Sequence, residues 1–149
     1  MQHIRSVNTF PERLIASELR RLGYSFARND SSILGKPDIS FRRHGVAVFI
    51  DSEFWHGKPG AYVLPKTNAV YWKRKIARNI LRDRSVTRRL RKAGWKVLRI
   101  WTADVKKRRA FCICKIVRAL RKETGTATVF RRVLKKRIRD SRRFPSTRN

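Results

Sequence analysis

Lys36-Pro37-Asp38-Ile39-Ser40-Phe41, followed after residues 42–45 by Val46-Ala47-Val48-Phe49-Ile50-Asp51, is the part of the chain that decides the fold. The first run predicts a strand from Asp38 to Phe41, and Arg42-Arg43-His44-Gly45 is typical of a tight hairpin turn. The unbroken apolar run from Val46 to Ile50 indicates a central strand covered on both faces. Asp38 and Asp51 stand at the ends of these two strands. Carboxylates at such positions suggest a site of catalysis, because they would not help the protein to bind an anion.

Helices and strands are also predicted on either side of this pair. A capping residue at Asn8 or Thr9, a proline, an acid and apolar residues at helical spacing predict a helix that runs to Leu22. Residues 24–28 alternate as a short strand. Ala69 to Ala93 reads as a long basic helix, and residues 95–101 as a strand. A last helix spans residues 105–122 and is expected to bury Phe111, Ile113, Ile116, Val117 and Leu120.

This order of elements predicts an α/β fold with a central mixed sheet of about four strands flanked by helices. The 149 residues are enough for one hydrophobic core, which we place in a single domain over residues 1–125. Residues 126–149 form a basic C-terminal extension, a tail with few large apolar side chains and many arginines. We expect that tail to be either a loose helix or a disordered arm.

The charge of the chain indicates a polyanionic partner. Lys and Arg number 39 against 10 Asp and Glu, for a formal net charge of +29. An anionic membrane is the competing partner, but no apolar stretch is long enough to span a bilayer and the N-terminus has no apolar signal core. We therefore expect a cytoplasmic protein, nucleoid-associated if bacterial. Cys112 and Cys114 lie two apart in a predicted helix, cannot form an ordinary disulfide and fit a reducing compartment.

The scarce acids suggest a metal site for phosphodiester chemistry. An aspartate on one strand and another on its hairpin neighbour, with a backbone carbonyl between, can hold Mg²⁺ against a phosphate. Asp38 and Asp51 have that relation. The lysine that usually stands two residues after the second acid is missing, because that position is Glu53. His56 is near enough to handle a proton. Alternatively, Asp38 is a turn residue after Pro37, Asp51 a solvated strand-end acid and His56 an ordinary surface histidine.

Several short motifs together resemble the very-short-patch-repair (Vsr-type) DNA mismatch endonucleases. The resemblance runs from about Asn8 to Trp101 in the same order and with nearly the same gaps. It implies a restriction-endonuclease-like fold, Mg²⁺ dependence and nicking on the 5′ side of the thymine in a T:G mismatch. The motifs are Asn8-Thr9-Phe10-Pro11-Glu12, Leu22-Gly23-Tyr24, Gly35-Lys36-Pro37-Asp38, Phe54-Trp55-His56, Pro65-Lys66-Thr67-Asn68, Trp72, Lys75-Ile76, Asn79, Arg82-Asp83-Arg84 and Gly94-Trp95-Lys96-Val97-Leu98.

The resemblance also implies roles for individual residues. Asp38 matches the metal-binding aspartate, the backbone carbonyl of Ile50 a second ligand, and His56 a catalytic histidine. Glu12 and Asp83 match two outlying acids that hold the histidine, waters or the N-terminal helix in place. Related homing endonucleases share the same scattered set of Glu, Asp, His and Asp.

DNA contacts are predicted in the Phe54-Trp55 loop and on the long helix. Phe54, Trp55 and Trp72 match aromatic side chains that wedge between base pairs. Trp72, Ile76, Asn79 and Asp83 are spaced to share one helix face, which is not an ordinary core stripe. The predicted DNA-binding residues are Phe54, Trp55, Lys66, Trp72, Lys73, Lys75, Arg78, Asn79 and Arg82.

The chain departs from the family pattern in two places. Asp51 stands where the family commonly has a second histidine, and this aspartate restores the two-carboxylate metal site of other nucleases on the fold. The positions of a structural zinc site read Glu53, Lys58, Pro59 to Gly60, and Ala103 or its neighbours. We therefore expect Mg²⁺ as the cofactor and no structural zinc.

These observations predict a Mg²⁺-dependent endonuclease that nicks double-stranded DNA at or near a T:G mismatch. Asp38 and Asp51 are expected to hold the metal, with the Ile50 carbonyl, and His56, Glu12 and Asp83 to complete the catalytic set. We expect a monomer with no membrane or small-molecule partner. Two alternatives stay open: a homing or mobile-element nuclease of the same fold, and a non-catalytic basic nucleic-acid-binding protein.

Overall fold

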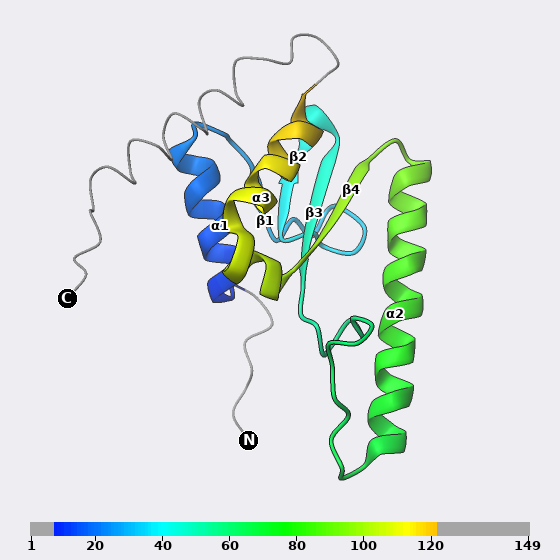
Figure 1. Cartoon of the computed structure of the whole chain (residues 1–149). Helices are drawn as coiled ribbons and strands as arrows, with labels where there is room; N and C mark the ends of the chain where they lie inside the picture. Colours follow the sequence, from blue (N-terminus) through cyan, green and yellow to red (C-terminus); the bar gives the residue numbers. More distant parts are fainter. Residues whose placement is uncertain (1–7, 122–149) are drawn as a thin grey trace, which may run out of the picture.

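The computed structural model describes residues 8–121 and has a mixed four-stranded sheet with helices on both faces (Figure 1). In chain order the elements are α1 (Phe10–Arg21), β1 (Ala27–Arg28), β2 (Ile39–Phe41), the 3₁₀ turn η1 (Arg42–His44), β3 (Val46–Asp51), α2 (Ala69–Lys92), β4 (Lys96–Trp101) and α3 (Thr102–Leu120). This order and the α/β class confirm the fold predicted from the sequence.

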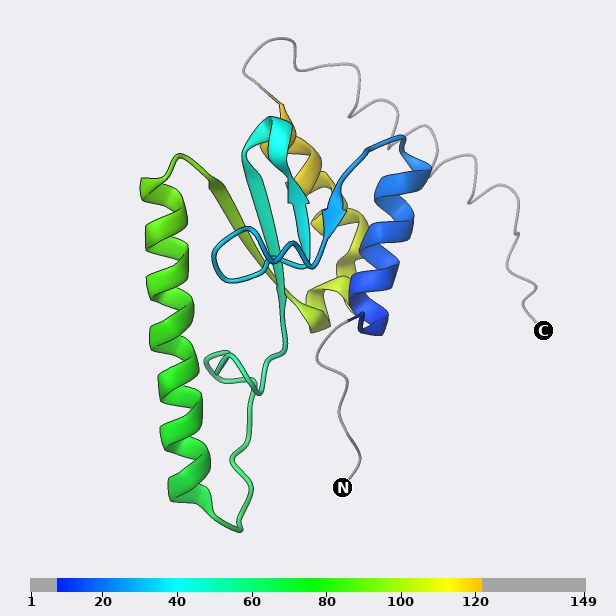
Figure 2. The same cartoon turned by 180° about the vertical axis from the view of Figure 1, so that it is seen from behind.

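The sheet has the strand order β1-β2-β3-β4. β2 pairs antiparallel with both β1 and β3, whereas β3 and β4 run parallel. The parallel pair requires a crossover, and the segment from residue 52 through α2 supplies it. α1 and α3 lie together on one face of the sheet and α2 lies on the other, as the two opposite views show (Figures 1 and 2).

Alternation along β3 divides the core into two hydrophobic clusters. Val46 and Val48 pack with α1 and α3, and Ala47 and Phe49 pack toward α2 with Leu90 and Val97. Both faces of β3 are therefore covered, as its unbroken apolar run predicted. Asp51 ends the same strand and, by the period of two, leaves it on the α2 face.

Some sequence predictions were wrong in detail. The residue 24–28 strand is only Ala27–Arg28. The tight hairpin turn predicted at residues 42–45 is confirmed, because it joins the antiparallel strands β2 and β3; residues 42–44 form a short 3₁₀ helix before Gly45, which has a φ of 60°. α3 begins at Thr102 rather than residue 105, and Phe111 on it is 59% exposed instead of buried. The buried side of α3 includes Cys112, Ile113, Ile116, Val117 and Leu120, and position 111 falls outside this stripe of the helix.

The crossover segment places functional side chains beyond the end of the sheet. Residues 52–68 contain neither helix nor strand, and they run beside the N-terminal half of α2, which extends past the sheet (Figure 1). Gly57 has a φ of 60°, and a Cβ there would lie 2.6 Å from Ile80 Cδ1 of α2. A glycine is therefore required where this segment touches the helix.

The basic tail predicted over residues 126–149 lies outside the described residues. Within residues 8–121, none of the helices is both long and apolar enough to cross a membrane.

Candidate active site

Asp38 stands directly before β2, with its carboxylate aimed at the neighbouring strand. Its Oδ2 accepts a hydrogen bond from the backbone N–H of Ile50 at 2.6 Å. The preceding loop is fixed by Asp30, whose carboxylate accepts hydrogen bonds from the Arg42 guanidinium at 2.8 and 2.9 Å. This Arg42 contact holds the pKa of Asp30 well below its usual range. Asp38 is thus held in place at the side of β3 that leads into the crossover.

The Asp38 carboxylate is in an environment that disfavours its charge. Burial is the largest influence and raises its pKa to about 6, and the negative charges of Glu12 and Asp51 add to that rise. The Ile50 hydrogen bond and the charge of His56 act in the opposite direction but do not outweigh burial. A cation bound beside Asp38 would relieve this burial of negative charge.

Asp51 is 4% exposed and forms a bidentate ion pair with Arg99 of β4. Arg99 Nε and Nη2 donate to the two carboxylate oxygens at 2.6 and 2.9 Å. The same guanidinium lies 3.2 Å from Asp83 Oδ1 and 4.8 Å above the Phe49 ring. Arg99 was not predicted as a site residue. The available signal was a single arginine in the middle of the otherwise apolar strand from Val97 to Trp101.

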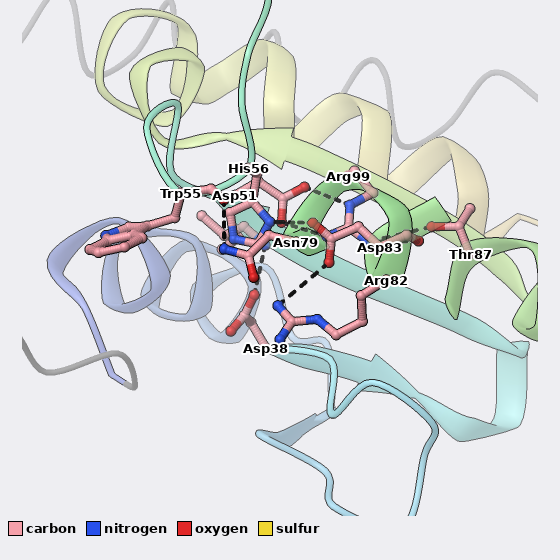
Figure 3. Close-up of polar contacts among 10 residues, drawn as sticks. Asp38, Asp51, Trp55, His56, Asn79, Arg82, Asp83, Thr87 and Arg99 are labelled. Atoms are coloured by element: carbon pink, nitrogen blue, oxygen red, sulfur yellow. Dashed lines mark hydrogen bonds and ion pairs between the residues drawn. The ribbon is translucent and has the colours of Figure 1, made fainter. Parts of the chain in front are cut away.

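His56 and Asp83 form a close pair between the crossover segment and α2 (Figure 3). His56 Nδ1 is 2.5 Å from Asp83 Oδ2 and 3.6 Å from Asp51 Oδ1. A carboxylate at Nδ1 favours the tautomer with its proton there, which leaves Nε2 free to accept a proton. Burial alone would raise the pKa of Asp83, but His56 and Arg99 outweigh it and lower that pKa.

One face of α2 supplies the contacts to this site, as its sequence spacing predicted. Asp83 binds His56, and one helical turn earlier Asn79 Nδ2 donates to the backbone carbonyl of Trp55 at 3.1 Å. Ile76 is buried on the same face, and Trp72 touches the aromatic residues of the crossover. The face is therefore committed to the functional segment rather than to the main core.

Glu12 is 3% exposed and acts at the start of α1. Its carboxylate accepts hydrogen bonds from the backbone N–H groups of Asn8 and Thr9 at 2.9 and 3.1 Å. Arg28 Nη2 lies 3.7 Å from its Oε2. These contacts hold the start of the N-terminal helix in place, which is one of the three roles predicted for Glu12. Its charge nevertheless acts on Asp38.

An aromatic cluster, defined here as Phe54, Trp55, Tyr71 and Trp72, lies next to the His56 pair. Ring centroids are 5.0 to 5.7 Å apart for the contacting pairs. Lys75 Nζ lies 5.2 to 5.7 Å from the rings of Trp55, Tyr71 and Trp72. A cation held over aromatic faces is consistent with a surface that binds both phosphate and stacked bases.

The other basic residues predicted to hold DNA lie along α2 and just before it. Lys66, Lys73, Arg78 and Arg82 are exposed, and Arg82 lies 3.9 Å from Asp83. A cavity of about 490 Å³ opens beside the His56 pair on the same side of the sheet. Its lining residues are Asp51, His56, Ile80, Asp83, Arg84, Thr87, Arg88, Arg91, Arg99 and Trp101.

The positions where the family resemblance suggests zinc ligands also lie close together. Glu53 accepts hydrogen bonds from Thr102 Oγ1 and Ala103 N at 2.6 and 2.7 Å. Lys58 Nζ lies 5.4 Å above the Trp101 ring. Burial would raise the pKa of Glu53, but the hydrogen bonds from Thr102 and Ala103 lower it below its ordinary value. The expected lack of a structural zinc stays a prediction.

The raised pKa of Asp38 leads to a prediction for stability. In metal-free buffer, Asp38→Asn is expected to be more stable than wild type at pH 7.5, by about 1–3 kcal/mol for a shift from 3.8 to about 6. Because its pKa is raised on folding, protonated Asp38 stabilises the folded protein. This stabilisation is complete below pH 3.8 and is lost as the pH rises through about 6. Urea unfolding of both proteins at several pH values measures the difference, which should vanish near the lower pH.

Asp51→Asn provides the control for that experiment. It breaks a buried pair and leaves Arg99 partly uncompensated, so it should be less stable than wild type at pH 7.5. An Asp38→Asn protein no more stable than wild type at that pH would contradict the account of the Asp38 environment.

The fold and the site together define a class of protein. A restriction-endonuclease-like core carries Asp38, Asp51, His56 and Asp83 at one end of its sheet, beside aromatic and basic side chains, in a chain with a charge of +29. The class is that of the DNA endonucleases.

Comparison with known proteins identifies the family. The family model described as DNA mismatch endonuclease Vsr matches residues 1–61. The chain is 45% identical over 127 residues to the type II nicking enzyme V.NmeDIP of Neisseria meningitidis serogroup C, covering 84% of this chain and 86% of that one. It is 32% identical over 109 residues to the DNA mismatch endonuclease Vsr of Escherichia coli strain K12, covering 72% of this chain and 70% of that one. The chain belongs to the Vsr family of DNA mismatch endonucleases.

A second nicking enzyme supports the same assignment. Over 106 residues the chain is 43% identical to V.HpaIIP of Haemophilus parainfluenzae, covering 69% of this chain and 74% of that one. The alternative of a basic binding protein without catalysis is thereby set aside, and DNA is the substrate.

Proposed function

We propose that this endonuclease nicks one strand of duplex DNA at or next to a T:G mismatch in a Mg²⁺-dependent reaction. The observation that carries the proposal is the joining of a buried acid and histidine site to an aromatic cluster by one short segment, residues 54–56. A nuclease specific for matched duplex has less use for adjacent aromatic rings at the site of cleavage. The similarity to nicking enzymes and to a mismatch endonuclease supports the proposal.

Asp38 and its neighbours suit a divalent cation. The Asp38 carboxylate is buried and crowded by the charges of Glu12 and Asp51, and it accepts a hydrogen bond from a neutral group, the Ile50 N–H. Within residues 8–121, no three His, Cys, Asp or Glu side chains form a ready metal-ligand group. Mg²⁺ commonly takes one or two carboxylates and completes its shell with water and phosphate, so this set is compatible.

Asp38, the Ile50 carbonyl and Asp51 are the residues that would hold Mg²⁺. Bound there, the ion supplies positive charge against the scissile phosphate. Asp51 already pairs with Arg99, and the remaining lone pairs of its oxygens are the ones available for a metal. The bidentate pair with Arg99 fixes the orientation of this carboxylate.

His56 is assigned the proton transfer. Asp83 binds its Nδ1, so Nε2 is the atom that accepts a proton from the attacking water or returns one to the leaving oxygen. Asp83 stabilises the imidazolium that results, and Arg99 keeps Asp83 ionised. Every residue in this proposal comes from one chain, so we propose that a monomer is sufficient for cleavage.

The aromatic cluster is assigned the recognition of the mismatch. Inserting a ring between base pairs costs a few kcal/mol of unstacking, and a mispaired site lowers that cost. The exposed basic residues Lys66, Lys73, Arg78 and Arg82 are assigned to the DNA backbone, which positions the duplex without reading its sequence. Lys75 is assigned to the boundary between phosphate and rings because it already lies over the aromatic cluster.

A comparison of three duplexes tests this proposal. Labelled duplexes that differ only at one pair, T:G, T:A or C:G, are incubated with the protein in Mg²⁺, and strand cleavage is followed on denaturing gels. We expect cleavage of one strand, with T:G preferred by about 10- to 100-fold because its unstacking costs less. The control is each reaction in EDTA.

Equal rates on the three duplexes would discard the mismatch proposal while keeping the nuclease. That result would favour the homing or mobile-element type of activity on a matched target. Cleavage in EDTA at the rate seen in Mg²⁺ would instead reject the metal assignment.

A further inference from the structure

The segment that carries the main functional side chains is a short coil with little regular structure of its own. We name residues 52–58 the aromatic turn, since they include Phe54, Trp55 and His56. Its internal hydrogen bonds run from His56 N to Ser52 O at 3.1 Å, from Gly57 N to Phe54 O at 3.3 Å and from Lys58 N to Glu53 O at 2.9 Å. These bonds curl the segment but do not fix its position on the protein. Contacts with other elements must therefore position it.

The second half of the aromatic turn is attached to α2. Asn79 donates to the Trp55 carbonyl at 3.1 Å, and His56 binds Asp83. The backbone at Gly57 packs against Ile76 and Ile80 closely enough to exclude a Cβ. These contacts hold the segment from Trp55 onward to the long helix.

The first half is attached to a different element, the junction of β4 and α3. Glu53 Oε2 accepts a hydrogen bond from the Thr102 hydroxyl at 2.6 Å, and Oε1 accepts one from the Ala103 N–H at 2.7 Å. Both donors lie in the first turn of α3, where backbone N–H groups lack partners within the helix. An ionised carboxylate is favoured there by the helix dipole as well.

Phe54 enters the aromatic cluster through ring contacts. Its ring contacts are with Trp55 and Trp72, at centroid distances of 5.0 and 5.7 Å. Ring packing is weakly directional compared with a pair of short hydrogen bonds to a charged acceptor. The position of Glu53, one residue before Phe54, therefore sets where the Phe54 backbone enters the aromatic cluster.

We propose that Glu53 is a positioning residue that fastens the aromatic turn to the first turn of α3 and thereby aligns Phe54 and Trp55 for insertion into DNA. The DNA part of this inference rests on the proposed function, whereas the attachment does not. Glu53 and Asn79 then hold the aromatic turn from two sides, with α3 on one and α2 on the other.

The attachment is tested first without DNA. In Glu53→Ala, amide hydrogen exchange of His56, Gly57 and Lys58 is expected to be about five- to tenfold faster than in wild type, the loss expected from removing a cap. Glu53→Gln keeps one carbonyl acceptor, so its exchange should fall between the two. Asp104→Ala is the matched control, because Asp104 is an acid in the same first turn of α3 that pairs with Arg108 at 2.8 Å. Its aromatic turn should exchange at the wild-type rate.

The consequence for DNA is tested with the same variants. Single-turnover cleavage of the T:G duplex at saturating protein should be about tenfold slower in Glu53→Ala, since fewer molecules hold the competent arrangement. The dissociation constant should change by less than about threefold, because the phosphate contacts are retained. Fluorescence of 2-aminopurine beside the mismatch reports unstacking, and its rise should be smaller in Glu53→Ala than in Asp104→Ala.

Two results would overturn the inference. One is wild-type exchange of the aromatic turn in Glu53→Ala, and the other is faster exchange with wild-type cleavage and unstacking. If instead the wild-type protein does not distinguish T:G from T:A, the proposed mismatch function fails, and the exchange experiment still decides the attachment. Glu53→Gln supplies the same comparisons if Glu53→Ala does not fold.

Discussion

Asp38→Asn is expected to cleave DNA at least about 10³-fold more slowly than wild type, in keeping with the loss of a preorganised electrostatic group at a reacting centre. Asparagine keeps the size of the side chain and an oxygen that can accept the Ile50 N–H bond, but it removes the charge that attracts a cation. The variant is also expected to fold, because the buried charge it removes opposes folding at neutral pH. Single-turnover cleavage across a Mg²⁺ titration measures the effect.

The form of that titration separates metal binding from other roles. If Asp38 holds the ion, higher Mg²⁺ should recover part of the lost rate, while binding to the duplex stays near that of wild type. Wild-type cleavage should also decline as the pH falls through about 6 at limiting Mg²⁺, because protonated Asp38 no longer attracts the cation.

Glu18→Gln is a suitable control for the Asp38 experiment. Glu18 is an acid of α1 that pairs with Arg21 at 2.6 Å, away from β2. Its variant should cleave at the wild-type rate. Wild-type activity in Asp38→Asn would mean that the active site proposed for this protein is wrong.

His56→Ala is expected to lower the single-turnover rate by about 10²- to 10⁴-fold, the range typical of a lost general acid or base. Asp83→Asn should cost less, about 10- to 100-fold, because it alters the tautomer and orientation of His56 without removing the ring. The rates are measured on the T:G duplex with saturating Mg²⁺, so that metal binding does not limit them.

Added imidazole distinguishes proton transfer from a purely structural role of His56. A small base that enters the vacated site should restore part of the rate in His56→Ala and none in Asp38→Asn. His44→Ala is the control, because His44 lies against Phe41 at the far end of β2. A His56→Ala rate within about threefold of wild type would remove His56 from the catalytic set.

The elements of the fold could be predicted from the sequence because each has a local cause. Thr9 and Glu12 start α1, the apolar run of β3 requires cover on both faces, and the spacing of Trp72, Asn79 and Asp83 indicates one helix face. The spacing also predicted which side of α2 turns toward the site. Phe111 was placed wrongly because helical spacing alone does not say how wide the buried stripe of α3 is.

The partners of the site acids could not be predicted in the same way. Asp51 pairs with Arg99, which is 48 residues away in the sequence and is brought close by the parallel pairing of β3 and β4. Glu53 reaches the start of α3 across a similar separation. Such contacts depend on strand register and on where the crossover ends, and neither leaves a local signal in sequence.

The sequence by itself determined the element order, the charge and the residue types of the active site, because propensity, hydrophobic periodicity and short motifs are local properties. Only the tertiary structure decided which side chains pair: Asp83 with His56, Arg99 with Asp51, and Glu53 with Thr102 and Ala103. The physical reason is that the two members of each pair come from different parts of the chain, which the fold brings together. Their distances are fixed by how the sheet and helices α1, α2 and α3 pack, not by spacing along the chain.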